Sequence, residues 1–113
     1  TNAFDKAMAR SPESVDGARL EVTLSRYGPA MDGRDTAAPV LARAGELAGI
    51  AIHGGARGGA SDASHLAGDI AVTIDGLGPR GGGAHAPHEF VSASSLLPRA
   101  RVALAVAAAA LGA

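Results

Sequence analysis

Two histidines in the last third of the sequence have the type and spacing that could hold a metal ion. His85 and His88 lie three positions apart, and Glu89 follows directly. Zinc accepts imidazole and carboxylate ligands, but a local site of this kind needs a helix to bring both histidines onto one face. Pro87 and the glycines before His85 argue against a helix. We therefore expect no self-contained metal site here, since a loop histidine is more often solvated than a ligand.

A second candidate for chemistry is the glycine-rich run 76–81, which has the G-x-G-x-x-G spacing of dinucleotide-binding loops. A dinucleotide site also requires a helix that opens at the third glycine and an acidic residue about 20 positions further on. More glycines and a proline follow instead, and residues 97–101 hold no carboxylate. Residues 54–59 lack the Lys-Ser or Lys-Thr of a P-loop, and residues 59–63 do not form a G-x-S-x-G nucleophile elbow. The sequence therefore predicts neither a nucleotide site nor a serine nucleophile.

Helices and short strands must position any functional side chain. Helical spacing or capping signals predict helices over residues 2–10, 36–48 and 94–111, and a short one up to residue 67. Asp35 or Thr36 can cap the second of these helices, and Gly49 can end it. Ser61 or Asp62 can cap the short helix, and Asp62 is more readily a cap than an acid. Ser94 can cap the last helix.

Two segments predict strands. Residues 19–26 alternate apolar and polar side chains, as a half-buried strand does. Residues 70–74 are continuously apolar or β-branched, which is typical of a buried parallel strand. The segments 50–53 and 89–91 are expected to be extended, and residues 75–88 to form a long loop. Together with the helices, this pattern predicts an α/β fold.

The composition limits the kind of protein. With 113 residues and no cysteine, the chain is one small domain or a piece of a larger one, without disulfides. Its net charge of -1 and its scattered arginines form no basic stripe, so we expect no nucleic-acid partner. Residues 102–113 are fewer than the roughly 20 apolar residues that span a bilayer, so we expect no membrane anchor. Alanine supplies 27 residues and Leu, Ile, Val and Phe together 23, which predicts a thin core.

Four blocks occur in an order and spacing found in one enzyme family. They are GGASDAS at 58–64, TIDGLGP at 73–79, GGGAHAPHEFV at 81–91 and SLLPR at 95–99. With these blocks the chain resembles the C-terminal end of the zinc amidohydrolase and peptidase family. That family includes bacterial glutamate carboxypeptidase, aminoacylase, acetylornithine deacetylase and succinyl-diaminopimelate desuccinylase.

The resemblance implies an architecture for both parts of the chain. Residues 31–113 would be the C-terminal segment of a catalytic domain with a mixed, mainly parallel sheet flanked by helices. Residues 1–30 would be the last helix and strand of an α+β lid domain that also serves dimerisation. The expected partners are therefore the N-terminal remainder of the same enzyme and, for the intact protein, a second copy in a homodimer.

The resemblance also implies a metal site and a substrate. Such enzymes hold two zinc ions, with cobalt as a possible replacement, and His85 matches the metal-binding histidine of the family. Ser61, Asp62, Gly82 and Gly83 would line the substrate cleft. The metal ions polarise the substrate carbonyl and lower the pKa of bound water. The implied reaction is cleavage of an amide or peptide bond next to a carboxylate, in N-acyl amino acids or small peptides.

The family's other catalytic residues have no match in this chain. Its His-x-Asp motif, bridging Asp and adjacent Glu pair lie upstream in the family, so we expect no catalytic residue here and no activity of the isolated chain. A non-catalytic remnant or pairing module, which keeps the fold without a complete metal site, is the alternative. An upstream segment that carries His-x-Asp and Glu-Glu would favour the enzyme.

The end of the predicted lid strand carries a prediction about specificity. Where glutamate carboxypeptidases have an Arg before a Pro to hold the substrate carboxylate, this chain has Gly28 before Pro29. Arg26 lies two positions earlier, on the same face of an extended strand, and is the candidate replacement. In the intact enzyme, Arg26→Ala should reduce the preference for an N-acyl amino acid over its amide, measured as a ratio of kcat/KM. An unchanged ratio would reject this role.

Overall fold

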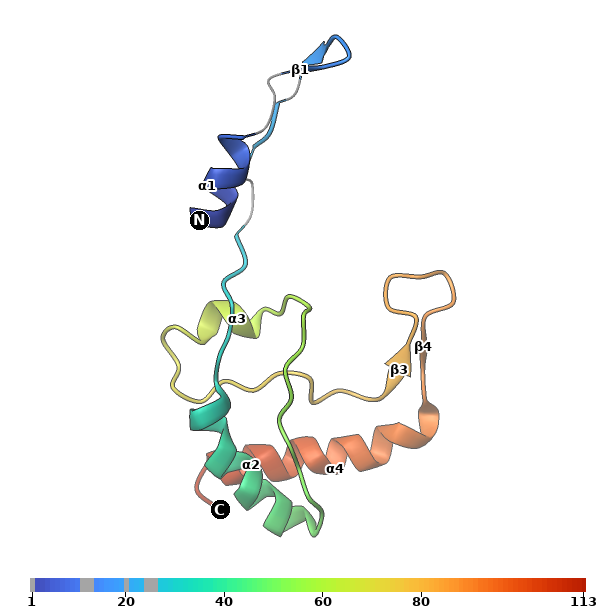
Figure 1. Ribbon diagram of the computed structural model, residues 1–113. Coiled ribbons are helices and arrows are strands. Elements are labelled where there is room, and N and C mark those ends of the chain that lie inside the picture. Colours follow the sequence, from blue (N-terminus) through green and yellow to red (C-terminus); the bar gives the residue numbers. More distant parts are fainter. Residues whose placement is uncertain (1, 11–13, 20, 24–26) are drawn as a thin grey trace.

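The computed structural model describes residues 2–10, 14–19, 21–23 and 27–113. In Figure 1, helix α1 (Asn2–Met8) and the hairpin of β1 (Ser14–Val15) and β2 (Ala18–Arg19) stand away from the other elements. The molecule measures 62 × 35 × 18 Å, and its radius of gyration is 19.5 Å. A compact domain of this length would have a radius of gyration of about 13 Å. The chain is therefore markedly extended. The predicted boundary at residue 30, between a lid domain and a catalytic domain, stays a prediction.

Two helices, α2 (Arg34–Ala48) and α4 (Ala93–Ala110), pack against each other and hold the core. The buried residues of this cluster are Ala44, Val102, Ala105 and Val106. These side chains are small, so the two helices can approach closely. Among the described residues no large side chain is fully buried. The thin core expected from the composition is thus observed.

The predicted helix 36–48 is confirmed as α2, which begins two residues earlier than expected. The predicted caps were wrong: Asp35 and Thr36 lie inside the helix, and the N-cap is Gly33, which has no capping side chain. Thr36 Oγ1 instead donates a hydrogen bond back to the carbonyl of Gly33 at 3.3 Å. Gly49 ends the helix as predicted, with the left-handed φ of 68° that favours glycine.

An ion pair joins the first residue of α2 to the segment before it. Arg34 Nε and Nη2 donate to the two carboxylate oxygens of Asp32 at 2.8 and 2.6 Å. These bonds lower the pKa of Asp32 to about 2. The pair is therefore intact at neutral pH, and its contribution is lost as the pH falls toward that pKa. Both side chains are exposed, so the pair adds little to stability.

Helix α4 confirms the prediction of a C-terminal helix, with Ser92 rather than Ser94 at its N-cap. By length and composition alone, its 18 residues with mean hydropathy 1.2 could cross a membrane. A core helix satisfies the same criterion, and Val102 and Val106 of α4 are buried in the contact with α2. The expected absence of a membrane anchor stays a prediction.

The remaining helices are short. The prediction over 2–10 is confirmed as α1, which ends at Met8, and the short helix before residue 67 is confirmed as α3 (Ala63–Leu66). Ser61 rather than Asp62 caps α3, because Ser61 Oγ accepts a hydrogen bond from the Ala63 N–H at 3.1 Å. Asp62 occupies the N-cap position but its side chain makes no capping bond, so of the two predicted caps only Ser61 forms the bond.

Both predicted strands differ from the structure. Only residue 19 of the segment 19–26 lies in a strand, residues 21–23 have no regular structure, and residues 20 and 24–26 lie outside the described residues. Residues 70–74 form no strand. A parallel strand exists only beside a neighbouring strand, and the described chain offers none to this segment.

The sheets that do form are small and antiparallel. β1 pairs with β2, and β3 (Gly81–Gly82) pairs with β4 (Phe90–Val91). The expected mainly parallel sheet is therefore not present in the described residues, and the architecture is mixed α/β with helices dominant.

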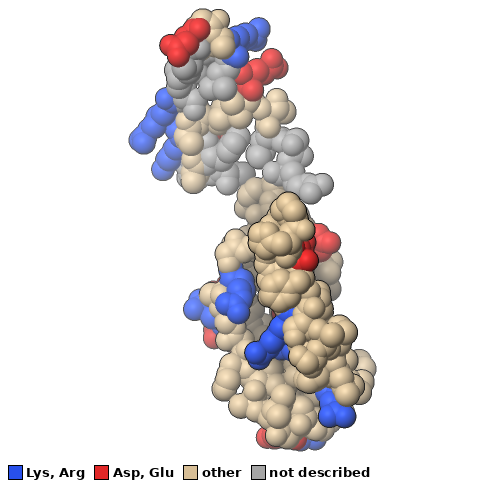
Figure 2. Space-filling model, turned by 90° about the vertical axis from the view of Figure 1, so that its right-hand side faces the viewer, with Lys and Arg blue, Asp and Glu red and all other residues tan. Residues whose placement is uncertain are grey.

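Many large apolar side chains remain exposed. They include Leu47, Leu96, Leu97, Leu104, Phe90 and Val91. In Figure 2 the lower part of the molecule presents wide areas without Lys, Arg, Asp or Glu. Exposed large apolar side chains in this number favour association.

We expect the isolated chain to associate and to lack a sharp cooperative thermal transition, because its core is thin and its apolar surface exposed. Circular dichroism melting at several concentrations, together with light scattering, measures both properties. A sharp transition in a monomer at low concentration would contradict this expectation.

Candidate functional site

His85, the metal ligand predicted from the resemblance, lies at the tip of the β3–β4 hairpin. Gly81 pairs with Val91 and Gly82 with Phe90, so the two strands lie side by side in antiparallel orientation and lead into the turn that holds His85. A Cβ on Gly82 would stand 2.9 Å from Cε1 of Phe90, so any other residue would require this exposed ring to move. The resemblance gave Gly82 and Gly83 a substrate role, which stays a prediction. Within this chain, glycine is favoured at both positions by the close approach of Phe90 to Gly82 and by the positive φ of Gly83.

His85 occupies an unusual backbone conformation. Its φ is 65°, a left-handed value that residues other than glycine seldom adopt, although His is among those enriched there. Hydrogen bonds from the Ala86 N–H to the Gly83 carbonyl and from the Glu89 N–H to the Ala86 carbonyl close the turn around it. The imidazole is exposed and makes no hydrogen bond or ion pair to any described residue. Both ring nitrogens are thus free to act as ligands.

His88 differs from His85 in its surroundings. Its Cδ2 lies 3.0 Å from the position of a Cβ on Gly83, so the ring rests against the hairpin backbone. Gly83 itself has φ 69° and tolerates this approach only as glycine. His88 is exposed like His85, but one edge of its ring lies against the turn.

Ser61 and Asp62 lie at a different place from His85. Ser61 lines a groove of about 1390 Å³ between α2, the segment 50–60 and residues 73–76, whereas His85 does not line it. In Figure 1, α3 and the β3–β4 hairpin lie on opposite sides of the lower part of the molecule. The shared cleft implied by the resemblance is thus not formed by this chain alone and stays a prediction.

The described residues do not form a complete metal site. No group of three or more His, Asp or Glu side chains in this part of the chain is placed to hold one ion. His85 could supply one ligand, and the residues present do not fit a resident metal by themselves. Arg26, the predicted carboxylate-binding residue, lies outside the described residues.

The glycine-rich run 76–81 serves a structural purpose that sequence reasoning missed. Arg99 of α4 donates from Nη2 to the Gly76 carbonyl at 2.7 Å and from Nε to the Gly78 carbonyl at 2.9 Å. A phosphate site needs backbone N–H groups turned toward the ligand, whereas here two carbonyl oxygens face a guanidinium. Gly81 then enters strand β3 instead of opening a helix. The expected lack of a helix at the third glycine is thus observed, and the absence of a dinucleotide site stays a prediction.

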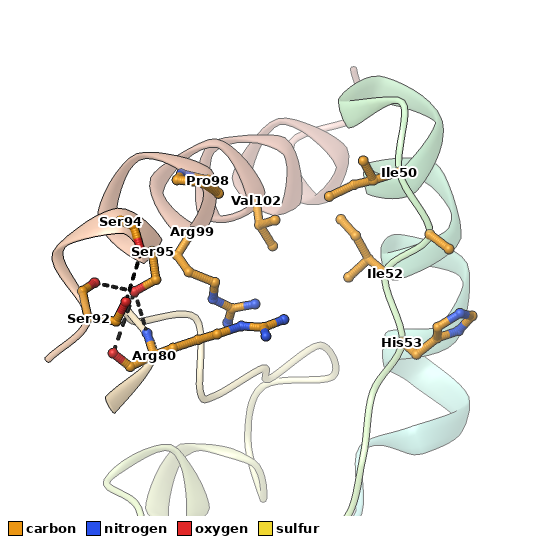
Figure 3. A pocket seen from close by; sticks show the side chains of 11 residues that line it. Ile50, Ile52, His53, Arg80, Ser92, Ser94, Ser95, Pro98, Arg99 and Val102 are labelled. Carbon is orange, nitrogen blue, oxygen red and sulfur yellow. Dashed lines mark hydrogen bonds between the residues drawn. The ribbon is translucent and has the colours of Figure 1, made fainter. Parts of the chain in front are cut away.

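A hollow of about 660 Å³ lies beside the first turns of α4. Figure 3 shows Arg80 and Arg99 projecting into it from one side, with Ile52 and His53 on the other. Because neither this hollow nor the groove includes His85, the candidate ligand stands apart from both on the hairpin tip.

Comparison with known proteins assigns the family. Residues 8–109 match the family model described as Peptidase family M20/M25/M40, which covers nearly the whole chain. The chain belongs to this peptidase family. No curated protein and no solved structure matches it. Membership implies hydrolase activity of the metallopeptidase type for the family in general, and it agrees with the resemblance seen in the four sequence blocks.

The ligand role predicted for His85 implies that His85→Ala in the intact enzyme lowers both the bound metal content and the turnover by orders of magnitude. His88→Ala should be mild, since the resemblance gives His88 no ligand role and its side chain is exposed. Elemental analysis of the dialysed protein and steady-state kinetics measure the two effects. Equal losses in both variants would mean that the ligand is misassigned.

A glycine variant separates ligand loss from backbone strain. His85→Gly removes the imidazole but suits a φ of 65° better than alanine does, so the turn should persist. We expect its metal content to fall as far as that of His85→Ala. Normal metal content in His85→Gly would show that the alanine variant acts through the backbone.

Proposed function

We propose that this chain is the C-terminal part of a dinuclear zinc hydrolase that cleaves amide or peptide bonds next to a carboxylate. N-acyl amino acids and small peptides are the proposed substrates. The observation that carries the proposal is His85, a free imidazole at a hairpin tip in a chain that matches a metallopeptidase family over residues 8–109. His85 would hold one coordination position of the metal site.

The backbone at His85 supports a functional role. A left-handed conformation costs a residue with a Cβ about 1 kcal/mol, and glycine would avoid this cost. The neighbouring residues 81–83 are all glycine, so the local sequence tolerates glycine readily. A histidine kept in such a position is best explained by the use of its side chain.

The remaining parts of the proposed site would come from the N-terminal remainder of the enzyme. The described residues provide no second ligand beside His85, so no catalytic step is derived from this chain alone. Ser61 and Asp62 would approach the substrate from the edge of the groove once the remainder is present. Residues 1–30 would belong to the lid that joins two copies in a homodimer.

A non-catalytic pairing module remains the alternative function. Two features of the described residues are compatible with it: the missing three-ligand cluster and the wide apolar surface. Both features also fit a chain that is completed by its own upstream segment. The reading frame upstream of Thr1 distinguishes the two, because only the enzyme requires His-x-Asp and Glu-Glu there.

The isolated chain should not hydrolyse an N-acetyl amino acid when zinc or cobalt is added, because it provides one of the ligands and no general base. Titration calorimetry should show no tight stoichiometric zinc binding. Addition or co-expression of the upstream segment should restore turnover, which His85→Ala then abolishes. Turnover together with tight zinc binding by the chain alone would contradict the proposal.

A further inference from the structure

The hollow of about 660 Å³ beside the first turns of α4 combines positive charge with apolar surface. Figure 3 shows the side chains of Arg80 and Arg99 extending into it with their guanidinium groups foremost. Ile50 and Ile52, from the segment that follows α2, lie on the other side, and Val102 of α4 adds a third apolar side chain. A ligand in the hollow would therefore meet two cations at one end and an apolar wall at the other.

The two positive charges in the hollow are not neutralised. In the described part of the chain the ion pairs are formed by other arginines, so neither Arg80 nor Arg99 is paired with a carboxylate. No Asp or Glu is among the described residues that line the hollow. Like charges that share a hollow repel each other, and the repulsion is stronger beside apolar surface than in open water. A bound oxyanion would remove this repulsion.

Both arginines are held in place by the start of α4 and the loop before β3. The N–H of Arg80 donates to Oγ of the buried Ser95 at 2.9 Å, and its carbonyl accepts a hydrogen bond from the Ser92 N–H at 2.8 Å. The side chain of Arg80 bonds to no described residue. Arg99 donates from Nε and Nη2 to two loop carbonyls at 2.9 and 2.7 Å, which leaves Nη1 for a ligand. Donors positioned in advance lose little conformational entropy on binding.

We propose that this hollow binds a small organic anion, with its carboxylate or phosphate held by Arg80 and Arg99 and a short apolar group against the isoleucines. Guanidinium groups form strong charge-assisted hydrogen bonds with both kinds of oxyanion. The volume lies in the range of small-molecule sites, and the apolar wall favours an anion that carries a hydrocarbon group. Binding here goes beyond the proposed function and requires no metal ion, because His85 does not line the hollow.

Saturation-transfer NMR of the chain with butyl phosphate and with valerate tests the site. Each probe carries an oxyanion and a short alkyl chain, whose protons report contact with the protein. We expect saturable binding of at least one probe, and the tighter of the two identifies the head group. The matching ion without the alkyl chain, inorganic phosphate or acetate, should compete more weakly, and butanol should not compete. Absence of saturable binding by both probes would overturn the proposal.

The charge requirement is tested with Arg80→Gln, whose altered side chain is not part of any hydrogen bond in the described residues. The dissociation constant of the tighter probe should rise about tenfold at constant ionic strength. Arg101 is an exposed residue of α4 that does not line the hollow, so Arg101→Gln is the matched control for loss of one positive charge. The control should change the dissociation constant by less than about twofold, because a distant exposed charge is screened. Equal effects of the two substitutions would mean general attraction of anions and would reject the site.

The apolar end is tested with Ile50→Ser. Ile50 is 52% exposed and lies outside the core cluster, so the fold should tolerate the change. It should weaken binding of the alkyl probe about threefold and leave competition by the matching ion unchanged. Equal weakening of both would contradict the proposed orientation of the ligand.

Two further measurements keep the result decisive. If circular dichroism shows that Arg80→Gln loses helix content, Arg80→Lys, which keeps the charge, takes its place: retained binding supports the site and lost binding overturns it. The titration is repeated at several protein concentrations. An affinity that falls as the protein concentration rises would mean that copies of the chain cover the hollow, and this outcome too would overturn the proposal.

Discussion

The contact between α2 and α4 is the constraint on which the other described elements from residue 34 onward depend. Ala44 is fully enclosed against Val102 and Val106, and its small side chain lets the helices come close. Gly45 has a related role, because a Cβ there would lie 2.8 Å from the Ile50 carbonyl oxygen. The chain that leaves α2 can therefore fold back along the helix only because residue 45 is glycine. Everything that α4 holds in turn, including the hairpin, is positioned by this helix pair.

The helices could be predicted from the sequence because their signals are local. Gly49 ends α2 as its type predicts, although Pro39 and Pro98 lie past the first turns of α2 and α4, where proline is best tolerated. A strand such as 70–74 depends on a neighbour elsewhere in the chain, and no local pattern reveals whether that neighbour is present. One local signal was overlooked: Asp16-Gly17, with φ values of 50° and 80°, forms the turn of the β1–β2 hairpin.

At the candidate site, too, some features could be predicted from the sequence and others could not. The resemblance of a residue block pointed to His85, but only the coordinates show its left-handed backbone and free imidazole. Asp62 and Ser61 are both good caps, and the sequence could not tell which hydroxyl or carboxylate would reach the Ala63 N–H. Arg99 had no signature at all. Its acceptors are backbone carbonyls more than 20 residues away in the sequence. Every residue type has such a carbonyl, so the sequence does not indicate which one an arginine will bind.

The glycine run explains why spacing alone is a weak guide to function. A G-x-G-x-x-G pattern states where side chains are absent and the backbone is accessible, but not which backbone atoms face outward. N–H groups turned outward would attract a phosphate, while the carbonyl oxygens of Gly76 and Gly78 attract a guanidinium. The two arrangements have opposite polarity, so one loop conformation cannot serve both. A helix that opens directly at the third glycine would favour the phosphate; a strand there, followed by a helix that returns an arginine to the loop, favours the carbonyl contact seen here.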